Sequence, residues 1–226
     1  MADNNQLGLS DKYSLRGRVF DTIRDRIISG EYPNDMELRE LTLAKEFNVS
    51  RTPIREALRQ LELEGLVNII PNKGAYVIGI TKRDIIDIYY MRSLLEGLCA
   101  KMAVHNITEE QLQDLEENID LSEFALSKKR MDHVVDLDNE FHDLLYRASN
   151  SRMLHRTLSD FHQYLEPLRK KSLSDSERVS NTIDEHRKIV EAIKNKDEKK
   201  AYDLANGHIL KSIDNLENKH LLSGNS

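Results

Sequence analysis

The chain has 226 residues, one cysteine, no tryptophan and a formal net charge of −6. A chain of this length can bury a core without disulfides or metals. It contains no run of about 18 apolar residues, which argues against a transmembrane helix, and its polar start argues against a secretory signal. We therefore expect a cytoplasmic protein with no membrane partner. With only nine glycines and four prolines, a mainly α-helical fold is favoured over a sandwich or barrel.

The first 80 residues show three helical patterns followed by a hairpin pattern. Apolar residues recur at helical spacing, Ser50 and Thr52 are possible N-caps of the third helix, and Gly65 ends it. The expected elements are helices at 15–29, 40–47 and 50–64, and strands at 67–70 and 75–78 around an Asn/Gly turn. This order predicts a winged helix-turn-helix domain over residues 12–80.

The third helix has two distinct faces. Arg51, Arg55 and Arg59 are spaced by four and share one face, whereas the neighbouring face is apolar (Ile54, Leu58 and Leu61). Such a helix can bury one side and place arginines in a DNA major groove, where they bond guanine or neutralise phosphates. An ordinary amphipathic helix has the same pattern, so the preceding turn, the caps and the wing are needed to favour DNA binding.

The segment VSRTPIREAL at residues 49–58, with LE at 61–62, EGLV at 64–67 and PNKGAYV at 71–77, resembles the DNA-binding signature of GntR-family bacterial transcription regulators. The resemblance implies that the third helix enters the major groove and that the wing tip reaches the minor groove. The DNA-contacting residues that it implies are Arg51 and Arg55 at bases or phosphates, Ser50 and Thr52 at phosphates, Lys73 and Gly74 at the wing tip, and Arg39 at the DNA backbone. Glu56 is expected to be structural, because DNA would repel a carboxylate.

Residues 81–220 predict an all-helical bundle of about six helices. The expected helices are at 82–104, 108–127, 131–148, 152–171, 180–195 and 197–217. Pro167 predicts a kink or an earlier end of the fourth of these helices. The serine-rich and charged stretch from Ser172 to Ser180 predicts a loop.

Four potential metal ligands lie on the apolar stripes of three of these helices. Asp138 and His142 are one turn apart, and His186 and His208 lie within the stripes of the last two helices. Each histidine alone is more often a hydrogen-bonded core residue. Together they indicate a divalent transition metal, with zinc, nickel or manganese all acceptable. A tetrahedral site would be closed and structural; we favour an octahedral ion that keeps positions for a ligand.

The C-terminal region also shows a resemblance. The pattern Arg92-x-x-x-Glu96, Asp138-x-x-x-His142, Asn150, His186 and His208 resembles the all-helical (FCD) effector domain of FadR-type GntR regulators. In the metal-binding branch, an aspartate and three histidines hold a metal at the floor of a ligand cavity. The resemblance implies a homodimer on pseudo-palindromic operator DNA and a small carboxylate or sugar-acid effector, rather than a long acyl thioester.

Arg92 has two interpretations that the sequence leaves open. It either clamps an effector carboxylate or forms an i,i+4 ion pair with Glu96. Cys99 is expected to be a small buried hydrophobic residue.

These patterns together predict a ligand-responsive transcription regulator that is not an enzyme. We take it to be a repressor, although operator position rather than sequence decides between repression and activation. The alternatives are a metal-dependent hydrolase or lyase with an accessory winged helix, a regulator with a purely structural metal, and an adaptor protein. The sequence has no HExxH motif, nucleophile elbow or Gly-rich phosphate loop. The arginine face argues against an adaptor.

Overall fold

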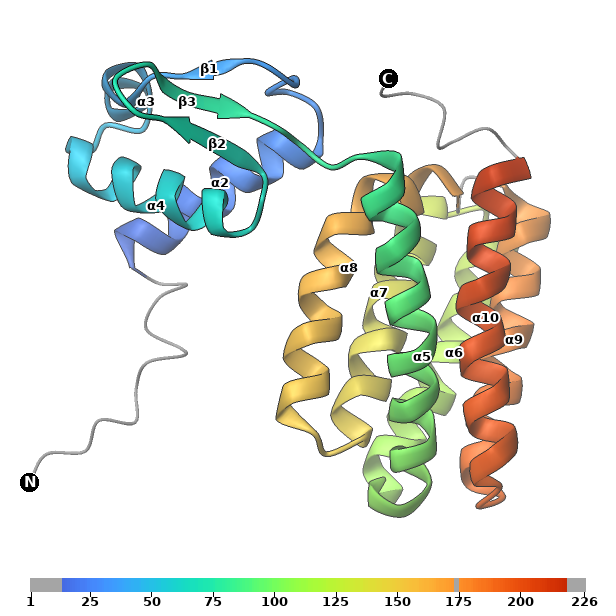
Figure 1. Ribbon diagram of the computed structural model, residues 1–226. Coiled ribbons are helices and arrows are strands. Elements are labelled where there is room, and N and C mark those ends of the chain that lie inside the picture. Colours follow the sequence, from blue (N-terminus) through green and yellow to red (C-terminus); the bar gives the residue numbers. More distant parts are fainter. Residues whose placement is uncertain (1–13, 173–174, 219–226) are drawn as a thin grey trace, which may run out of the picture. The chain divides into compact units, whose positions relative to one another are not determined.

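The computed structural model describes residues 14–172 and 175–218 (Figure 1). The chain divides into two compact units between Ile80 and Thr81. Both units are built mainly from helices, as the low glycine and proline content predicts. The outermost residues of the expected domains, 12–13 and 219–220, lie outside the described residues. No helix in the described ranges is long and apolar enough to cross a membrane.

The N-terminal unit is a three-helix domain with a small antiparallel sheet. Its elements are α2 (Leu15–Ile28), β1 (Glu37–Leu38), α3 (Glu40–Glu46), α4 (Arg51–Leu63), β2 (Val67–Ile70) and β3 (Gly74–Val77). The sheet order is β1-β3-β2, with Glu37 opposite Tyr76 and Val67 opposite Val77. The fold is a winged helix-turn-helix. Strand β1 is absent from the sequence prediction, because two residues are too few to show an alternating pattern.

The apolar face of α4 forms the centre of this unit. Ile54, Leu58 and Leu61 are buried, and α4 packs against α2, which contributes Val19 and Ile23 to the same core. This packing confirms the predicted inward face of α4 and leaves its arginine face exposed. The orientation of α4 therefore follows directly from the hydrophobic pattern.

The C-terminal unit contains six helices within the described residues. They are α5 (Lys82–Asn106), α6 (Glu109–Ser127), α7 (Met131–Ala148), α8 (Arg152–Ser172), α9 (Ser176–Lys194) and α10 (Glu198–Asn218). Capping boxes begin two of them, one from Thr81 with Asp84 and one from Thr108 with Gln111.

The structure differs from the sequence expectations at two places in this unit. Helix α8 continues past position 167 to Ser172, so Pro167 does not end it early. Helix α9 begins at Ser176, inside the stretch that was expected to be a loop. The Asp175 side chain accepts a hydrogen bond from the backbone N–H of Glu177 and so caps α9. Ser176, Glu177 and Arg178, which are part of the stretch that suggested a loop, lie in the first turn of this helix.

The bundle brings inward-facing polar residues together from several helices. Helices α5 and α10 lie side by side (Figure 1) and pack extensively. Gly97 allows this approach, because a Cβ atom there would lie 2.9 Å from the Tyr202 ring and 3.1 Å from the Tyr202 carbonyl oxygen. Cys99 on α5 is fully buried, as predicted. The polar residues on the inner faces of α5, α7, α9 and α10 therefore face one interior region.

Candidate DNA interface and metal centre

The start of α4 leaves hydroxyl groups exposed at a helix N-terminus. Ser50 is the N-cap residue, but its side chain makes no capping hydrogen bond, and Thr52 lies exposed in the first turn. Because backbone N–H groups at a helix start attract anions, this end of α4 suits a phosphate. The structure therefore leaves both predicted phosphate ligands accessible.

Arg51 and Arg55, the predicted base-reading residues, share one carboxylate partner. Glu40 accepts hydrogen bonds from Arg55 Nε and Nη2, both at 3.0 Å, and from Arg51 Nε at 3.1 Å and Nη2 at 2.6 Å. The hydrogen bond from Arg55 outweighs the opposing effect of burial and, with Arg51, lowers the pKa of Glu40 to about 2. The sequence prediction did not include this carboxylate.

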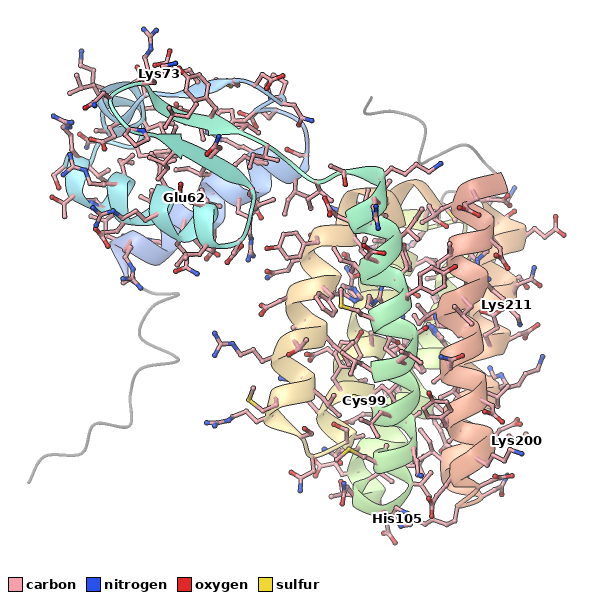
Figure 2. All side chains as sticks on the ribbon, viewed as in Figure 1. Glu62, Lys73, Cys99, His105, Lys200 and Lys211 are labelled. Atoms are coloured by element: carbon pink, nitrogen blue, oxygen red, sulfur yellow. The ribbon has the colours of Figure 1, made fainter. Side chains whose placement is uncertain are left out.

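The wing is a tight turn with a cationic tip. Asn72 and Gly74 have positive φ angles of 62° and 124°, and Figure 2 shows Lys73 at the turn between β2 and β3. A Cβ atom at Gly74 would lie 3.3 Å from Glu37 Oε1. Glu37 also pairs with Arg39, whose Nη2 lies 2.7 Å from Glu37 Oε2.

A groove of about 640 Å³ crosses this surface. It is lined by residues from α3, α4 and the sheet, including Glu37, Arg39, Glu40, Arg51, Arg55, Arg59, Ile69 and Gly74. The structure thus gathers four of the predicted DNA-binding residues, Arg39, Arg51, Arg55 and Gly74, along one groove. Glu56, predicted to be structural, pairs with Arg59 at 3.1 Å.

In the C-terminal unit, three histidines from three helices form a compact buried cluster. One ligand-type nitrogen from each of His142 on α7, His186 on α9 and His208 on α10 lies within 4.8 Å of the others. The His186 ring stacks on Phe141, with ring centroids 3.7 Å apart. Three of the four predicted metal ligands therefore lie together.

Carboxylates lie beside two of these imidazole rings, and one of them is hydrogen-bonded to its ring. His142 Nδ1 lies 2.9 Å from Glu96 Oε2, and His208 Nδ1 lies 2.7 Å from Glu185 Oε2. Because Nδ1 of His208 is hydrogen-bonded, its Nε2 is the nitrogen left for a metal, whereas His142 Nδ1 is buried and has no hydrogen-bond partner among the described residues. His186 Nε2 is buried and has no hydrogen-bond partner among the described residues.

Asp138, the fourth predicted ligand, lies beside the cluster but has an arginine partner. Its Oδ2 accepts from Arg169 Nη2, whereas its Oδ1 lies 3.7 Å from His186 Nε2. Arg169 also donates to Asn139 Oδ1 at 2.7 Å. The sequence prediction missed Arg169, although an aspartate on an apolar stripe requires either a cation or a metal.

Burial and charge give this region its protonation states. Burial lowers the pKa of His142 and, together with the neighbouring His208, holds the pKa of His186 well below its usual range. Burial opposes ionisation of Asp138, but Arg169 and the neighbouring histidines outweigh it and lower its pKa. Neutral imidazoles beside an ionised carboxylate are the donor set that binds a divalent cation.

Arg92 forms an ion pair with Glu96, which is one of the two interpretations that the sequence leaves open. Arg92 Nε donates to Glu96 Oε1 at 3.0 Å, and Tyr146 Oη donates to the same oxygen at 2.7 Å. Burial opposes ionisation of Glu96, but His142 and Arg92 outweigh it and hold its pKa well below its usual range. The Arg92 side chain is buried, with 1% of it exposed, and it lines a small cavity together with His142 and His208. The effector contact of Arg92 therefore stays a prediction.

That cavity is small, and most of the residues that line it are polar or charged. Its volume is about 30 Å³, and it is lined by Tyr89, Arg92, Asp138, His142, Arg169, Ser172, Arg178, Thr182, His208, Ile209 and Ser212. The sequence prediction did not find Tyr89, Arg169 and Arg178, because their helical patterns do not distinguish cavity-lining residues from ordinary buried ones.

Comparisons with known proteins agree with this architecture. Residues 15–77 match the family model of bacterial regulatory proteins of the gntR family, and residues 87–211 match the FCD domain model. The chain belongs to the GntR family of transcription regulators and carries an FCD domain. It is a DNA-binding transcription regulator and not an enzyme, so the hydrolase and lyase alternatives are dismissed.

The similar proteins cover almost the whole chain. It is 30% identical over 221 residues to the HTH-type transcriptional regulator YdhC of Bacillus subtilis, with 97% of each protein covered. It is also 30% identical to the gluconate operon transcriptional repressor of Bacillus subtilis, covering 82% of this chain and 78% of that protein. The structure of Escherichia coli McbR/YncC has the same fold, with a TM-score of 0.69 at 22% identity, covering 92% of this chain and 99% of that one.

Proposed function

We propose that this regulator is a repressor whose operator affinity is controlled by a small carboxylate or sugar-acid effector bound beside a metal in the FCD domain. The observation that carries this proposal is the buried cluster of His142, His186 and His208 at a cavity lined mostly by polar or charged residues. The gluconate operon repressor among its relatives supports repression and a sugar-acid effector. We also propose a cytoplasmic location, because the protein must reach DNA.

On the DNA side, α4 enters the major groove of operator DNA. Arg51 and Arg55 then reach base edges or nearby phosphates, and Ser50 and Thr52 bond phosphates through their free hydroxyls. The exposed positions of these residues support this arrangement. Lys73 and Gly74 contact the DNA from the wing, and Arg39 contacts the backbone.

In the FCD domain, the three histidines and Asp138 Oδ1 would hold zinc, nickel or manganese. The donor set fits a divalent cation because His186 Nε2 and His142 Nδ1 are buried and have no hydrogen-bond partner among the described residues, and because Glu185 orients His208. A cation bound there supplies positive charge for an effector carboxylate. Arg92 lines the same cavity and adds a guanidinium on the effector side.

The cavity size supports a small effector. A volume of about 30 Å³ holds one or two water molecules, so a carboxylate fits only after displacing water and shifting side chains. A long acyl chain has no comparable space there. Effector binding changes DNA affinity only if the effector prefers one arrangement of the DNA-binding domains.

We further propose a homodimer on a pseudo-palindromic operator, because one winged helix covers one half-site. Tyr90, Leu94 and Leu98 support a contact surface on α5: these large apolar residues recur every four positions and are exposed. Sedimentation of the full chain should give a dimer, and Leu94→Glu should shift it toward monomer. A wild-type monomer at micromolar concentration, with and without DNA, would contradict the dimer.

The metal proposal is tested on gently purified full-length protein. Elemental analysis should give one divalent ion per chain. Gluconate or a related hydroxy acid should raise the melting temperature of the metal-loaded protein and weaken its operator binding, and chelation of the metal should abolish both effects. If chelated protein responds normally to the acid, the metal is not part of the effector site. If chelation instead unfolds the domain, the metal is structural.

A further inference from the structure

Glu40 is the common partner of Arg51 and Arg55, two of the four arginines that line the groove of the N-terminal unit. It is the first residue of α3, and its side chain is only 26% exposed, whereas Arg51 and Arg55 remain about half exposed. The carboxylate is thus held against the domain while both guanidinium groups extend outward. No other carboxylate among the described residues is shown bonding to both arginines.

The geometry at Arg55 leaves a specific part of its guanidinium group free. Nε and Nη2 both donate to Glu40, one to each carboxylate oxygen, in a two-pronged pair. The N–H groups on Nη1 and on the far side of Nη2 remain. Those groups form the edge of a guanidinium that makes paired hydrogen bonds to O6 and N7 of guanine.

Glu40 and two neighbouring carboxylates also limit the attraction of this surface to DNA phosphates. Arg39, Arg51, Arg55 and Arg59 each have a carboxylate partner within the domain: Glu37, Glu40 or Glu56. Sequence-independent binding to DNA comes mostly from unpaired cations that neutralise phosphates. Because the arginines of this groove are already paired with carboxylates, they should contribute less affinity for DNA of arbitrary sequence.

We propose that Glu40 is a specificity-determining positioning residue, which stays bound to Arg55 in the complex, presents the guanine-reading edge of that arginine, and weakens binding to unrelated DNA. This inference rests on the proposed docking of α4 in the major groove. Glu40 acts through the arginines and contacts no base itself.

The test compares two duplexes, one selected by the full-length wild-type protein from a random-sequence pool and one scrambled duplex of the same composition. Glu40→Gln removes the charge and one acceptor oxygen. It should bind the scrambled duplex about threefold to tenfold more tightly, bind the selected duplex more weakly, and so lower the affinity ratio more than about tenfold. A pool selected again with this variant should show weaker guanine preference.

Two further variants separate charge from position. Glu40→Asp keeps the charge but withdraws the carboxylate, so it should weaken binding to the selected duplex while leaving the scrambled duplex near the wild-type affinity. Glu56→Gln changes the net charge equally but removes only the partner of Arg59, so it should keep the ratio within about twofold of wild type. Circular dichroism checks that each variant is folded.

Three results would overturn the inference. The first is an unchanged ratio of selected to scrambled affinity in Glu40→Gln, and the second is an equal fall of that ratio in Glu56→Gln. The third is that Glu40→Gln loses preference at a cytosine that Arg51→Ala and Arg55→Ala leave unaffected, because Glu40 would then contact that base directly. If the wild-type protein enriches no sequence, the proposed docking fails together with this inference. If it does and the ratio is unchanged, only the role of Glu40 fails.

Discussion

Glu185 Oε2 lies 2.7 Å from Nδ1 of His208, so Nε2 is the nitrogen that this ring has left for a metal at the histidine cluster. Glu185 is also bonded by Lys211 at 3.1 Å and approached by Arg178 at 3.4 Å. Burial opposes its ionisation, but the hydrogen bond and charge of His208, with Arg178 and Lys211, lower its pKa to about 2. Glu185 therefore stays ionised and orients His208.

Glu185→Ala should weaken metal binding without removing a ligand. A carboxylate that orients a histidine contributes about tenfold to 100-fold in metal affinity, so the dissociation constant for zinc should rise by that factor. Competition with a chromophoric chelator measures it. Glu191→Ala, at an exposed carboxylate on the same helix, should leave the affinity unchanged. Equal affinities in Glu185→Ala and wild type would mean that Glu185 does not support a metal ligand.

His208→Ala should lower metal content and the effector response together. The variant removes one of the three clustered imidazoles, whereas the DNA-binding domain has its own core and should still bind operator. Elemental analysis and a gel shift with and without effector measure the two properties. His133→Ala, at an exposed histidine of α7, is the matched control. Full metal content in His208→Ala would return the cluster to core hydrogen bonding.

Arg55→Ala should weaken operator binding and relax base preference. Loss of a two-pronged contact to guanine costs about 1–3 kcal/mol, which corresponds to a fall in affinity of roughly fivefold to 150-fold. Lys73→Ala, at the wing tip shown in Figure 2, should weaken binding to all sequences similarly and reduce the salt dependence. Fluorescence anisotropy at several salt concentrations distinguishes these effects. Unchanged specificity in Arg55→Ala would refute the docking of α4.

The sequence predicted the helices of both units well, because apolar spacing decides which face of a helix is buried. Ile54, Leu58 and Leu61 are examples. The same pattern could not identify Glu40, whose role depends on how the start of α3 meets α4. It also could not predict the start of α9, where Asp175 supplies a cap within a polar stretch that is typical of a loop.

For the proposed metal site, the stripes placed three histidines on facing helices, and the structure brings one ligand-type nitrogen of each within 4.8 Å of the others. The pairing of Asp138 with Arg169 could not be predicted from the sequence. Helix α8 carries several cationic residues, and only the packing of the helices determines which of them reaches Asp138. Arg92 and Glu96 are one helical turn apart, so spacing offered their pairing as one of two interpretations, and the structure shows the pair.

The close contact between α5 and α10 predicts opposite effects at two helical glycines. Gly97→Val would force side-chain atoms against the Tyr202 ring and carbonyl oxygen, separating the helices that carry Arg92 and His208. Such overpacking costs about 1–3 kcal/mol, which lowers the melting temperature by roughly 2–12 °C in a chain of this size.

Gly207 on α10 has open space around its Cβ position, so Gly207→Ala should raise stability by up to about 1 kcal/mol through helix propensity. Calorimetry of the full-length chain measures both variants, and metal titration of Gly97→Val reports whether the cluster of His142, His186 and His208 is disturbed. Both residues lie inside helices of the same bundle. If Gly97→Val and Gly207→Ala had equal melting temperatures, the close approach of α5 to Tyr202 would not be the reason for glycine at position 97.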